Sequence, residues 1–497
     1  MTTTSRTLPT LPTTASSPPP PTKNIWTKED DNLTTASPSQ LWRRELEGVE
    51  RFWTFSHLHL GGAFDMVSLF QLEPRLFETK GTNRTERMER WRRSWTKLRS
   101  IQPILGCQLD PQTSEITTSS TFDSEWAHHS VHLEEFVGSS EEEDGRMDLC
   151  METRRMDRFE LTLFFHPQDQ EVNWLAITNP HSLADAMAVF KLFKKLVEIH
   201  LEAIEEEEEE EVVFKVDPDR LPPSLSQALG FEPGQRGIQE IAKVARIQST
   251  TGLDILPKPD QVDSNKEEEE DGPLPTKKWR RLSKLNPSQT STLLTFCKSK
   301  GLTLASLVQA CIFHSILEVK GGAGSEDETF TLPAMLFSRL QRKEPEDPIY
   351  SATTFCPTSV TIPSGSSLVQ TALNVRESFR QALAFEVSCQ ETYIDGIIKL
   401  YSAVQAGHVP MPTTTIPTLS SLGDLDSDGG PFQGLKGYQI GSRNNQPSLG
   451  VHAWTLGREF HLSLSWCPGR FQEEQLEAFW DHLWRLIRLA ASGEEGI

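Results

Sequence analysis

One stretch of the chain, residues 174–190, limits the possible folds more than any other. It begins with the apolar run 174–177, which is short enough to be a buried strand, and Pro180 ends that strand because proline has no backbone N–H. From Leu183 onward, apolar residues recur at spacings of three and four, which predicts an amphipathic helix. The sequence therefore predicts a strand, a sharp turn and a helix, with His181 on the turn.

His181 has the chemistry of a general base. Side chains on such a turn tend to face a cleft rather than the core. An imidazole with an ordinary pKa of about 6.5 can take a proton from a hydroxyl near neutral pH. Four residues later comes Asp185, which completes a His-x-x-x-Asp motif that occurs once in the chain. The aspartate is better placed to hold the turn, by pairing with an arginine, than to touch a substrate.

The net charge of −21 is concentrated in three acidic runs. These runs are residues 141–144, 205–211 and 267–271. Runs of this kind are typical of solvated loops, and the rest of the chain is only mildly acidic. The sequence has no basic patch of the sort that nucleic-acid binding needs, so we expect no nucleic-acid partner.

The seven cysteines are scattered and show no C-x-x-C spacing, which favours a reducing compartment over a disulfide framework or a zinc site. The triplet His128, His129 and His132 has no acidic or cysteine ligand in register, so we expect no metal. No apolar run is long enough to cross a bilayer, and the N-terminus has no hydrophobic signal region. We therefore expect a cytoplasmic protein, with a monomer as the default state.

Composition and periodicity divide the chain into four segments. Residues 1–38 are rich in Thr, Pro and Ser, which predicts a disordered lead. Residues 39–204 mix strands and helices around the His motif, and residues 276–497 resume the same mixture. Between them, residues 205–275 carry short apolar islands among acidic and proline-rich stretches, which indicates a crossover linker with insertions. The expected fold class is α/β (α+β).

Apolar spacing and capping residues predict individual elements on either side of the linker. The N-terminal half should hold a helix at 41–52, a strand at 64–72, a helix at 84–101 and a strand at 159–165. The C-terminal half should hold a strand at 279–285, helices after Asn286 and Thr303, a strand at 330–339, a helical stretch at 368–398, a hairpin at 451–466 and a closing helix at 472–490.

This order of motifs resembles the chloramphenicol-acetyltransferase-like superfamily of CoA-dependent acyltransferases and condensation domains. The resemblance covers roughly residues 41–492 and is sharpest at the His-x-x-x-Asp motif. It is also carried by the helix at 301–310, the Ser338-Arg339 strand end, the stretch 419–423 and the final strand-strand-helix. Within the superfamily the chain is most similar to fungal alcohol acetyltransferases and trichothecene-type O-acetyltransferases. The Asp-Phe-Gly-Trp-Gly signature of the plant-type members does not occur.

The resemblance implies two similar domains, each a mixed sheet flanked by helices, with a tunnel between them. Acyl-CoA, expected to be acetyl-CoA, and a small alcohol of secondary metabolism would be the substrates, with no cofactor held permanently. His181 would deprotonate the alcohol, and Asp185 would be structural, with Arg339 as its candidate partner. Ser420 and Ser421 would lie near the tunnel, where either could donate to the oxyanion.

Two other functions remain open at this point. One is a condensation-type enzyme that forms an ester or amide from a carrier-bound acyl group, although Pro180 stands where condensation domains usually carry a second histidine. The other is a catalytically silent binding protein of the same fold. It is supported by the long acidic runs and by Ala186, where the family usually has glycine.

Overall fold

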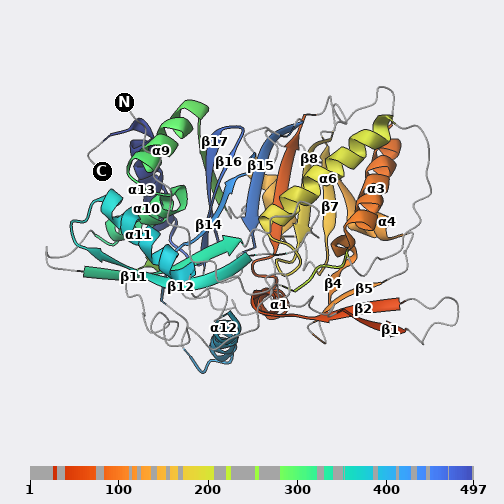
Figure 1. The fold of residues 1–497 in the computed structure, drawn as a ribbon, viewed down its shortest axis with the longest axis horizontal. Helices are drawn as coiled ribbons and strands as arrows, with labels where there is room; N and C mark the ends of the chain where they lie inside the picture. Colours follow the sequence, from red (N-terminus) through yellow and green to blue (C-terminus); the bar gives the residue numbers. More distant parts are fainter. Residues whose placement is uncertain are drawn as a thin grey trace, which may run out of the picture.

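The computed structural model describes residues 26–30, 40–73, 83–110, 113, 115–119, 125–135, 143–152, 157–165, 172–205, 220–224, 252–256, 280–321, 329–339, 351, 353–383, 390–409, 413–426, 432, 434–443, 448–467 and 469–494. Two larger sheets lie side by side, and helices cover them (Figure 1). The predicted linker lies outside the described residues apart from residues 205, 220–224 and 252–256, and so do most of the three acidic runs.

A five-stranded sheet in the order β15-β3-β8-β7-β6 forms the centre of the N-terminal part. Its strands are β3 (Met66–Leu72), β6 (Val131–Glu135), β7 (Glu160–Phe165), β8 (Val172–Asn179) and β15 (Leu435–Ser442). Neighbouring strands are antiparallel except for β6 and β7, which are parallel. The helices around it are α3 (Arg84–Ile101), α4 (Trp126–Ser130), α5 (Glu143–Glu152) and α6 (Ala186–Glu205).

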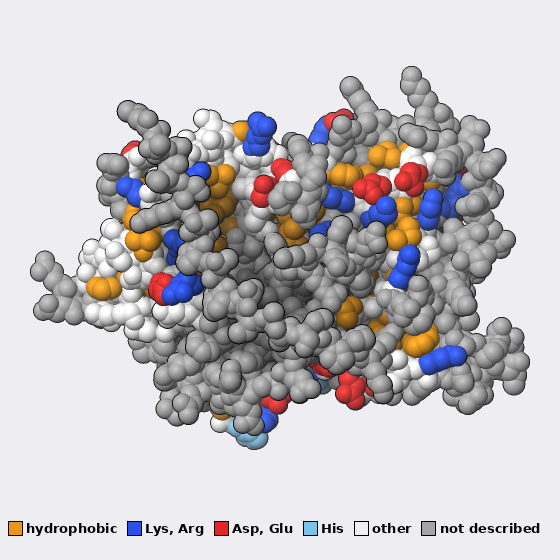
Figure 2. Space-filling model, viewed as in Figure 1, with side chains coloured by type: hydrophobic (Ala, Val, Ile, Leu, Met, Phe, Trp, Pro, Cys, Tyr) orange, Lys and Arg blue, Asp and Glu red, His pale blue; other side chains and the backbone are white. Residues whose placement is uncertain are grey.

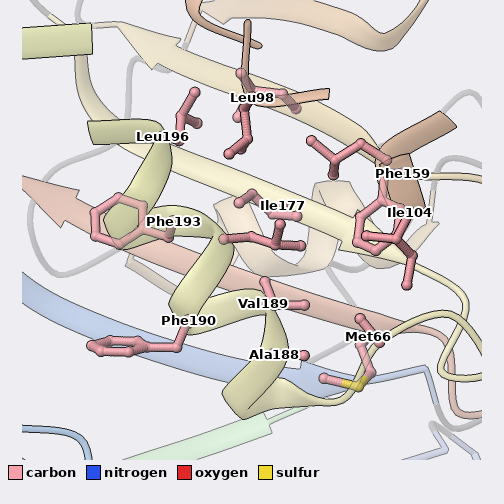
Figure 3. Packing of buried hydrophobic residues seen from close by; sticks show 14 of the residues in the cluster. Met66, Leu98, Ile104, Phe159, Ile177, Ala188, Val189, Phe190, Phe193 and Leu196 are labelled. Atoms are coloured by element: carbon pink, nitrogen blue, oxygen red, sulfur yellow. The ribbon is translucent and has the colours of Figure 1, made fainter. Parts of the chain in front are cut away.

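Side chains alternate between the two faces along each strand, and helices pack on both faces of this sheet. On one face, Phe70 of β3 stacks on Phe193 of α6 with ring centroids 3.8 Å apart. Figure 3 shows Phe193 and Leu196 of α6 meeting Ile177 of β8 and Leu98 of α3 in the same layer. On the other face, α5 covers the neighbouring positions of β3 and β8. This packing fixes β8 and α6, so the predicted strand, turn and helix are confirmed.

The fifth strand of the N-terminal sheet comes from the C-terminal half of the chain. β15 pairs antiparallel with β3 and closes what would otherwise be an open edge. Its Tyr438 is buried and shares a hydrogen bond with Ser68 of β3 over 3.2 Å. One strand of the segment predicted as the C-terminal domain, residues 276–497, is therefore part of the N-terminal sheet.

The second large sheet has the order β10-β17-β16-β14. Its strands are β10 (Arg280–Leu285), β14 (Thr418–Asp424), β16 (Leu449–Leu456) and β17 (Glu459–Trp466). The helices of this half are α9 (Pro287–Ser299), α10 (Leu304–Val319), α11 (Leu368–Leu383), α12 (Gln390–Gln405) and α13 (Glu473–Ser492). Asn286 and Thr303 both form capping boxes, which confirms the two predicted helix starts. The helical stretch predicted at 368–398 corresponds to α11 and α12.

Smaller elements complete the fold. β11 (Thr329–Arg339) and β12 (Thr353–Pro363) form an antiparallel pair, and β9 (Leu253–Asp254) pairs with β13 (Thr414–Thr415). A four-stranded sheet has the order β1-β2-β5-β4 and holds β1 (Thr27–Asp30), β2 (Gln40–Glu45), β4 (Gln108–Leu109) and β5 (Glu115–Ser119). A 3-10 helix spans Pro103–Gly106, and α1 spans Val49–His59.

The helix predicted at residues 41–52 is wrong in its first half. Residues 40–45 form strand β2, and the helix begins only at Val49. β2 is extended because it pairs with β1 and β5. Arg44 of this strand is buried, and its two terminal guanidinium nitrogens donate hydrogen bonds to the carboxylate of Glu50 over 2.8 and 2.9 Å. A buried, paired arginine is a tertiary feature that local spacing does not reveal.

Part of the predicted disordered lead is ordered. Residues 26–30 are described, and four of them form β1. Trp26 is buried, and its Nε1 donates a hydrogen bond to the carbonyl oxygen of Pro222 over 3.0 Å. A buried tryptophan with its N–H paired contributes enough apolar burial to order a short strand. The remainder of the lead up to residue 25 lies outside the described residues.

The described surface carries mixed charge. Figure 2 shows acidic and basic side chains interspersed over the described part of one face. Among the described residues, no single helix has the length and apolar character needed to cross a membrane, and α9 and α10 reach it only as a pair bent by 94°.

Candidate active site

The turn between β8 and α6 is closed by one buried amide. The Nδ2 of Asn179 donates to the carbonyl oxygens of Pro180 and Ala184, over 2.9 and 3.0 Å. The backbone N–H of Leu183 also donates to the Pro180 carbonyl oxygen over 3.1 Å. Residues 182–185 are buried as a result, whereas His181 is only partly buried. The turn therefore presents one side chain, the imidazole, at its partly exposed position.

Asp185 uses both carboxylate oxygens to hold this turn. Its Oδ1 accepts a hydrogen bond from the backbone N–H of Ala188 over 2.8 Å, which caps the first turn of α6. Its Oδ2 accepts one from Oγ1 of Thr353 in β12 over 3.2 Å. Asp185 is buried, so these contacts stabilise the carboxylate where water does not reach it.

Arg339, the expected partner of Asp185, is the last residue of β11. The antiparallel register places it directly opposite Thr353, which itself contacts Asp185. The backbone of Arg339 is therefore one strand away from the Asp185 contact, while its side chain lies outside the described part of the structure.

The imidazole of His181 lies against the indole of Trp53. The two ring centroids are 4.3 Å apart and the planes are nearly parallel, at 15°. Burial lowers the pKa of His181, more than contacts with its own backbone and with Asp185 raise it. The imidazole is therefore neutral at neutral pH, which is the form that can accept a proton.

Several buried polar atoms on this turn have no hydrogen-bond partner among the described residues. They are Oδ1 of Asn179, Nδ1 of His181, Oγ of Ser182 and Oγ of Ser351. Ser351 belongs to the same cluster, because its N–H donates to the Leu183 carbonyl oxygen over 3.2 Å. These four atoms can therefore pair with a polar group of a substrate or with water.

Ser420 and Ser421 lie half-buried on β14, at an irregularity in its pairing with β16 between Ser421 and Gly423. The next residue, Leu422, packs against the hydrophobic cluster that contains Leu183. That cluster extends over the whole N-terminal core. No hydrogen bond between described atoms joins either serine to His181.

Sequence reasoning missed three residues of this site: Trp53, Asn179 and Thr353. The Asn179-Pro180 pair is a turn signal, and an asparagine there is a candidate to bond its own turn. Trp53 and Thr353 are far from the motif in the chain and carry no local signal. Among the described residues, no group of three or more His, Cys, Asp or Glu side chains is arranged to hold a metal ion.

The chain is similar in sequence to a fungal protein. No protein-family model matches the chain. It is 33% identical over 445 residues to a probable alcohol acetyltransferase of Mycosarcoma maydis, an alignment that covers 88% of this chain and 94% of the relative.

Solved structures show the fold independently of that relative. The trichothecene 15-O-acetyltransferase from Fusarium sporotrichioides superposes with a TM-score of 0.72 at 14% identity, over 95% of this chain and 99% of that one. The cyclization-docking bidomain of a peptide synthetase from Sorangium cellulosum superposes with a TM-score of 0.59 at 13% identity, over 90% and 85%. The predicted mixed α/β fold of the chloramphenicol-acetyltransferase and condensation type is confirmed.

Proposed function

Because the chain belongs to the alcohol acetyltransferase family, we propose that it transfers an acetyl group from acetyl-CoA to a hydroxyl of a small secondary metabolite. The observation that carries this function is the neutral, partly exposed imidazole of His181 on a turn whose other residues are buried. The trichothecene acetyltransferase has the same fold and supports a small alcohol as the acceptor.

In this reaction His181 acts as the general base. Its imidazole takes the proton of the acceptor hydroxyl while that oxygen attacks the thioester carbonyl carbon. The carbonyl oxygen carries the negative charge in the tetrahedral intermediate. When the C–S bond breaks, the imidazolium returns the proton to the departing thiolate. The products are the acetate ester and free CoA, and no other reactant is needed.

The lowered pKa of His181 suits this step. A histidine that is neutral at pH 7 is ready to accept a proton without first losing one. The closed turn fixes the backbone of His181, which places the base at a defined position for the acceptor hydroxyl. Ser420 and Ser421 stay the candidate donors to the oxyanion, because the resemblance to this superfamily puts the stretch 419–423 near the tunnel.

Asp185 acts through the shape of the turn and does not touch the substrate. We expect it to pair with Arg339, and the register of β11 on β12 supports that pairing, because it brings Arg339 opposite Thr353. Ala186 is compatible with activity, because it starts α6 and packs its methyl group in the hydrophobic core.

The test is product analysis by mass spectrometry. The wild type and His181→Ala are incubated with acetyl-CoA and a panel of terpenoid and polyketide alcohols. We expect a mass gain of one acetyl group from the wild type alone. His408→Ala, on an exposed histidine, is the control and should keep its activity. Full activity in a folded His181→Ala protein would show that His181 is not the general base.

The choice of acyl donor distinguishes this function from condensation-type chemistry. The synthetase bidomain has a similar fold, so the fold alone does not separate the two. The same alcohols are offered an acetyl group on a carrier-protein phosphopantetheine. We expect turnover with free acetyl-CoA to exceed turnover with the carrier. A binding protein without activity would give no product with either donor.

Two finer properties also belong to this proposal. The seven cysteines are scattered and show no C-x-x-C spacing, which supports a reducing compartment, for which the cytoplasm is the candidate. Imaging of a fluorescent fusion tests that location. The monomeric state is tested by light scattering after size-exclusion chromatography.

A further inference from the structure

Three tryptophan–histidine stacks occur among the described residues. Besides Trp53 on His181, Trp91 stacks on His200 at 3.7 Å, and Trp454 stacks on His461 at 5.2 Å. In the last two pairs the histidine is buried, and burial lowers its pKa to about 3 for His200 and about 4 for His461. These two pairs are packing contacts inside the core. The first pair differs, because its histidine is partly exposed and carries the motif.

Trp53 belongs to a helix that meets the C-terminal half. α1 packs against α12 through a cluster that contains Phe52, Trp53 and Ile394. Phe64 closes this cluster, with its ring 5.3 Å from that of Trp53. The Nε2 of Gln405 at the end of α12 donates to the His59 carbonyl oxygen over 2.8 Å. The indole is thus held on a helix whose position depends on both halves of the chain.

The end of α1 is anchored by a buried charged cluster. The Nδ1 of His57 lies 3.0 Å from both carboxylate oxygens of Asp65, and Nη1 of Arg443 lies 3.6 Å from Oδ2 of the same residue. The Nε of Arg443 donates to the Met151 carbonyl oxygen over 2.8 Å. All four residues are buried. A shift of α1 would separate His57 from Asp65 and leave a buried charge without its partner. Because that is costly, the cluster holds the end of α1 in place.

We propose that Trp53 is a positioning residue for the reaction, and that its indole face holds the His181 ring in the orientation needed to take the acceptor proton. This inference rests on the proposed function. The indole covers one face of the imidazole, which keeps water from that face and removes a rotational freedom of the ring. It also offers a π-face to the imidazolium that forms in the transition state.

The indole has two opposing effects on the imidazole. Exclusion of water disfavours the imidazolium, whereas attraction to the π-face favours it. Burial is the main cause of the lowered pKa of His181, and the stacked indole contributes to that burial. Removal of the indole should therefore raise the pKa of His181 towards its ordinary value.

Other ionisable groups near His181 have to be separated from it in any titration. Asp185 lies on the same turn, and His57, with Asp65 and Arg443, lies one helical turn from Trp53. From α12 and β15 come Tyr401 and Tyr438, whose pKa values burial raises. Neither tyrosine titrates near neutral pH.

The experiment follows the His181 imidazole directly. Protein labelled on its histidine rings is titrated by NMR, and the His181 signal is identified by its loss in His181→Gln. Trp53→Leu removes the aromatic face that covers His181, and Trp53→Phe keeps a smaller one. The same two substitutions at Trp91, which stacks on the core residue His200, are the controls. The dependence of kcat on pH is measured for each protein.

We expect the pKa of His181 to rise by about one unit in Trp53→Leu, with kcat falling about tenfold more at acidic than at alkaline pH. Trp53→Phe should lie between Trp53→Leu and the wild type, and it decides the question if the leucine variant does not fold. The Trp91 variants should leave the His181 pKa unchanged. A His181 pKa that is the same in the Trp53 and Trp91 variants would overturn the inference. A wild type without acetyl transfer would instead reject the proposed function, and the NMR comparison would still decide whether the stack sets the state of the imidazole.

Discussion

Thr353 donates a hydrogen bond to Asp185 over 3.2 Å, across 168 positions of sequence. Asp185 belongs to the motif turn of the N-terminal sheet, and Thr353 begins β12 in the C-terminal half. The motif is therefore complete only when both halves are in place. The five-residue motif thus depends on a contact with Thr353, a distant residue that the sequence around the motif does not reveal.

The first prediction concerns that contact. Thr353→Val keeps the branched shape and removes the hydroxyl, so a buried carboxylate oxygen loses a donor. We expect a loss of about 1–3 kcal/mol in the free energy of unfolding, measured by urea denaturation, together with a lower kcat. Thr358→Val is the matched control, because Thr358 lies on the same strand as Thr353 and its hydroxyl shares a hydrogen bond with Ser378 of α11. It should lose stability without a comparable loss of kcat.

A second prediction tests the pairing of Asp185 with Arg339. Asp185→Asn keeps a side chain that can cap α6 but removes the charge, and Arg339→Gln removes the opposite charge. If the two groups pair, the effects of the single variants on kcat will not add in the double variant. If the loss of kcat in the double variant, expressed as a free energy, equals the sum of the two single losses, Arg339 is not the partner of Asp185.

The third prediction is the pH dependence of the reaction. Burial lowers the pKa of His181, so its neutral form is already present at a pH below its ordinary value. The value of kcat/KM should therefore rise with pH, with a midpoint below about 6.5, and then level off. Release of free CoA, followed with a thiol reagent, gives the rates. A midpoint above the ordinary histidine value would contradict the buried environment of the base.

Stability should also depend on pH, through the buried histidines of the core. His200 has a pKa of about 3 in the folded protein, well below its ordinary value when unfolded. Between those two values the unfolded chain binds a proton that the folded chain does not, so stability falls as pH falls. We expect the urea midpoint to drop from neutral pH towards about pH 5, and to drop less in His200→Gln. An equal drop in both proteins would assign the effect to other groups.

The fifth prediction concerns Gly62. It has φ of 81°, and a Cβ there would lie 2.5 Å from Nη1 of Arg443 and 2.6 Å from Oδ2 of Asp65. Gly62→Ala should therefore disturb the anchor of α1 and lower both stability and kcat. Gly407→Ala is the control, because Gly407 has φ of 72° with nothing within 4 Å of a Cβ. It should cost only the backbone strain, about 1–2 kcal/mol, and leave kcat intact.

Sequence reasoning succeeded where the determinants are local. The strand, turn and helix around His181 follow from apolar spacing and from Pro180, and the helix starts at Asn286 and Thr303 follow from capping residues. It failed at residues 41–45, because the helical spacing there was overridden by pairing with β1 and β5. Trp26 was hidden in a proline-rich lead for the same reason, since its partner is Pro222.

The candidate site divides in the same way. His181 and Asp185 could be found because motif and turn coincide in one stretch of sequence. Trp53 could not, because its contact with His181 arises from the packing of α1 against α12. Thr353 could not either, since its place opposite Arg339 depends on the register of two strands whose pairing is not local.

The placement of β15 has a consequence for how the protein is made. Ser68 and Tyr438, which meet across β3 and β15, are 370 positions apart. A ribosome needs roughly 20 to 70 seconds to add that much chain at 5–20 residues per second. During this interval the edge of β3 that β15 later covers has no partner from its own fold, and an open strand edge can pair with other chains. The nascent N-terminal half therefore has to be protected until the strand that completes it leaves the ribosome.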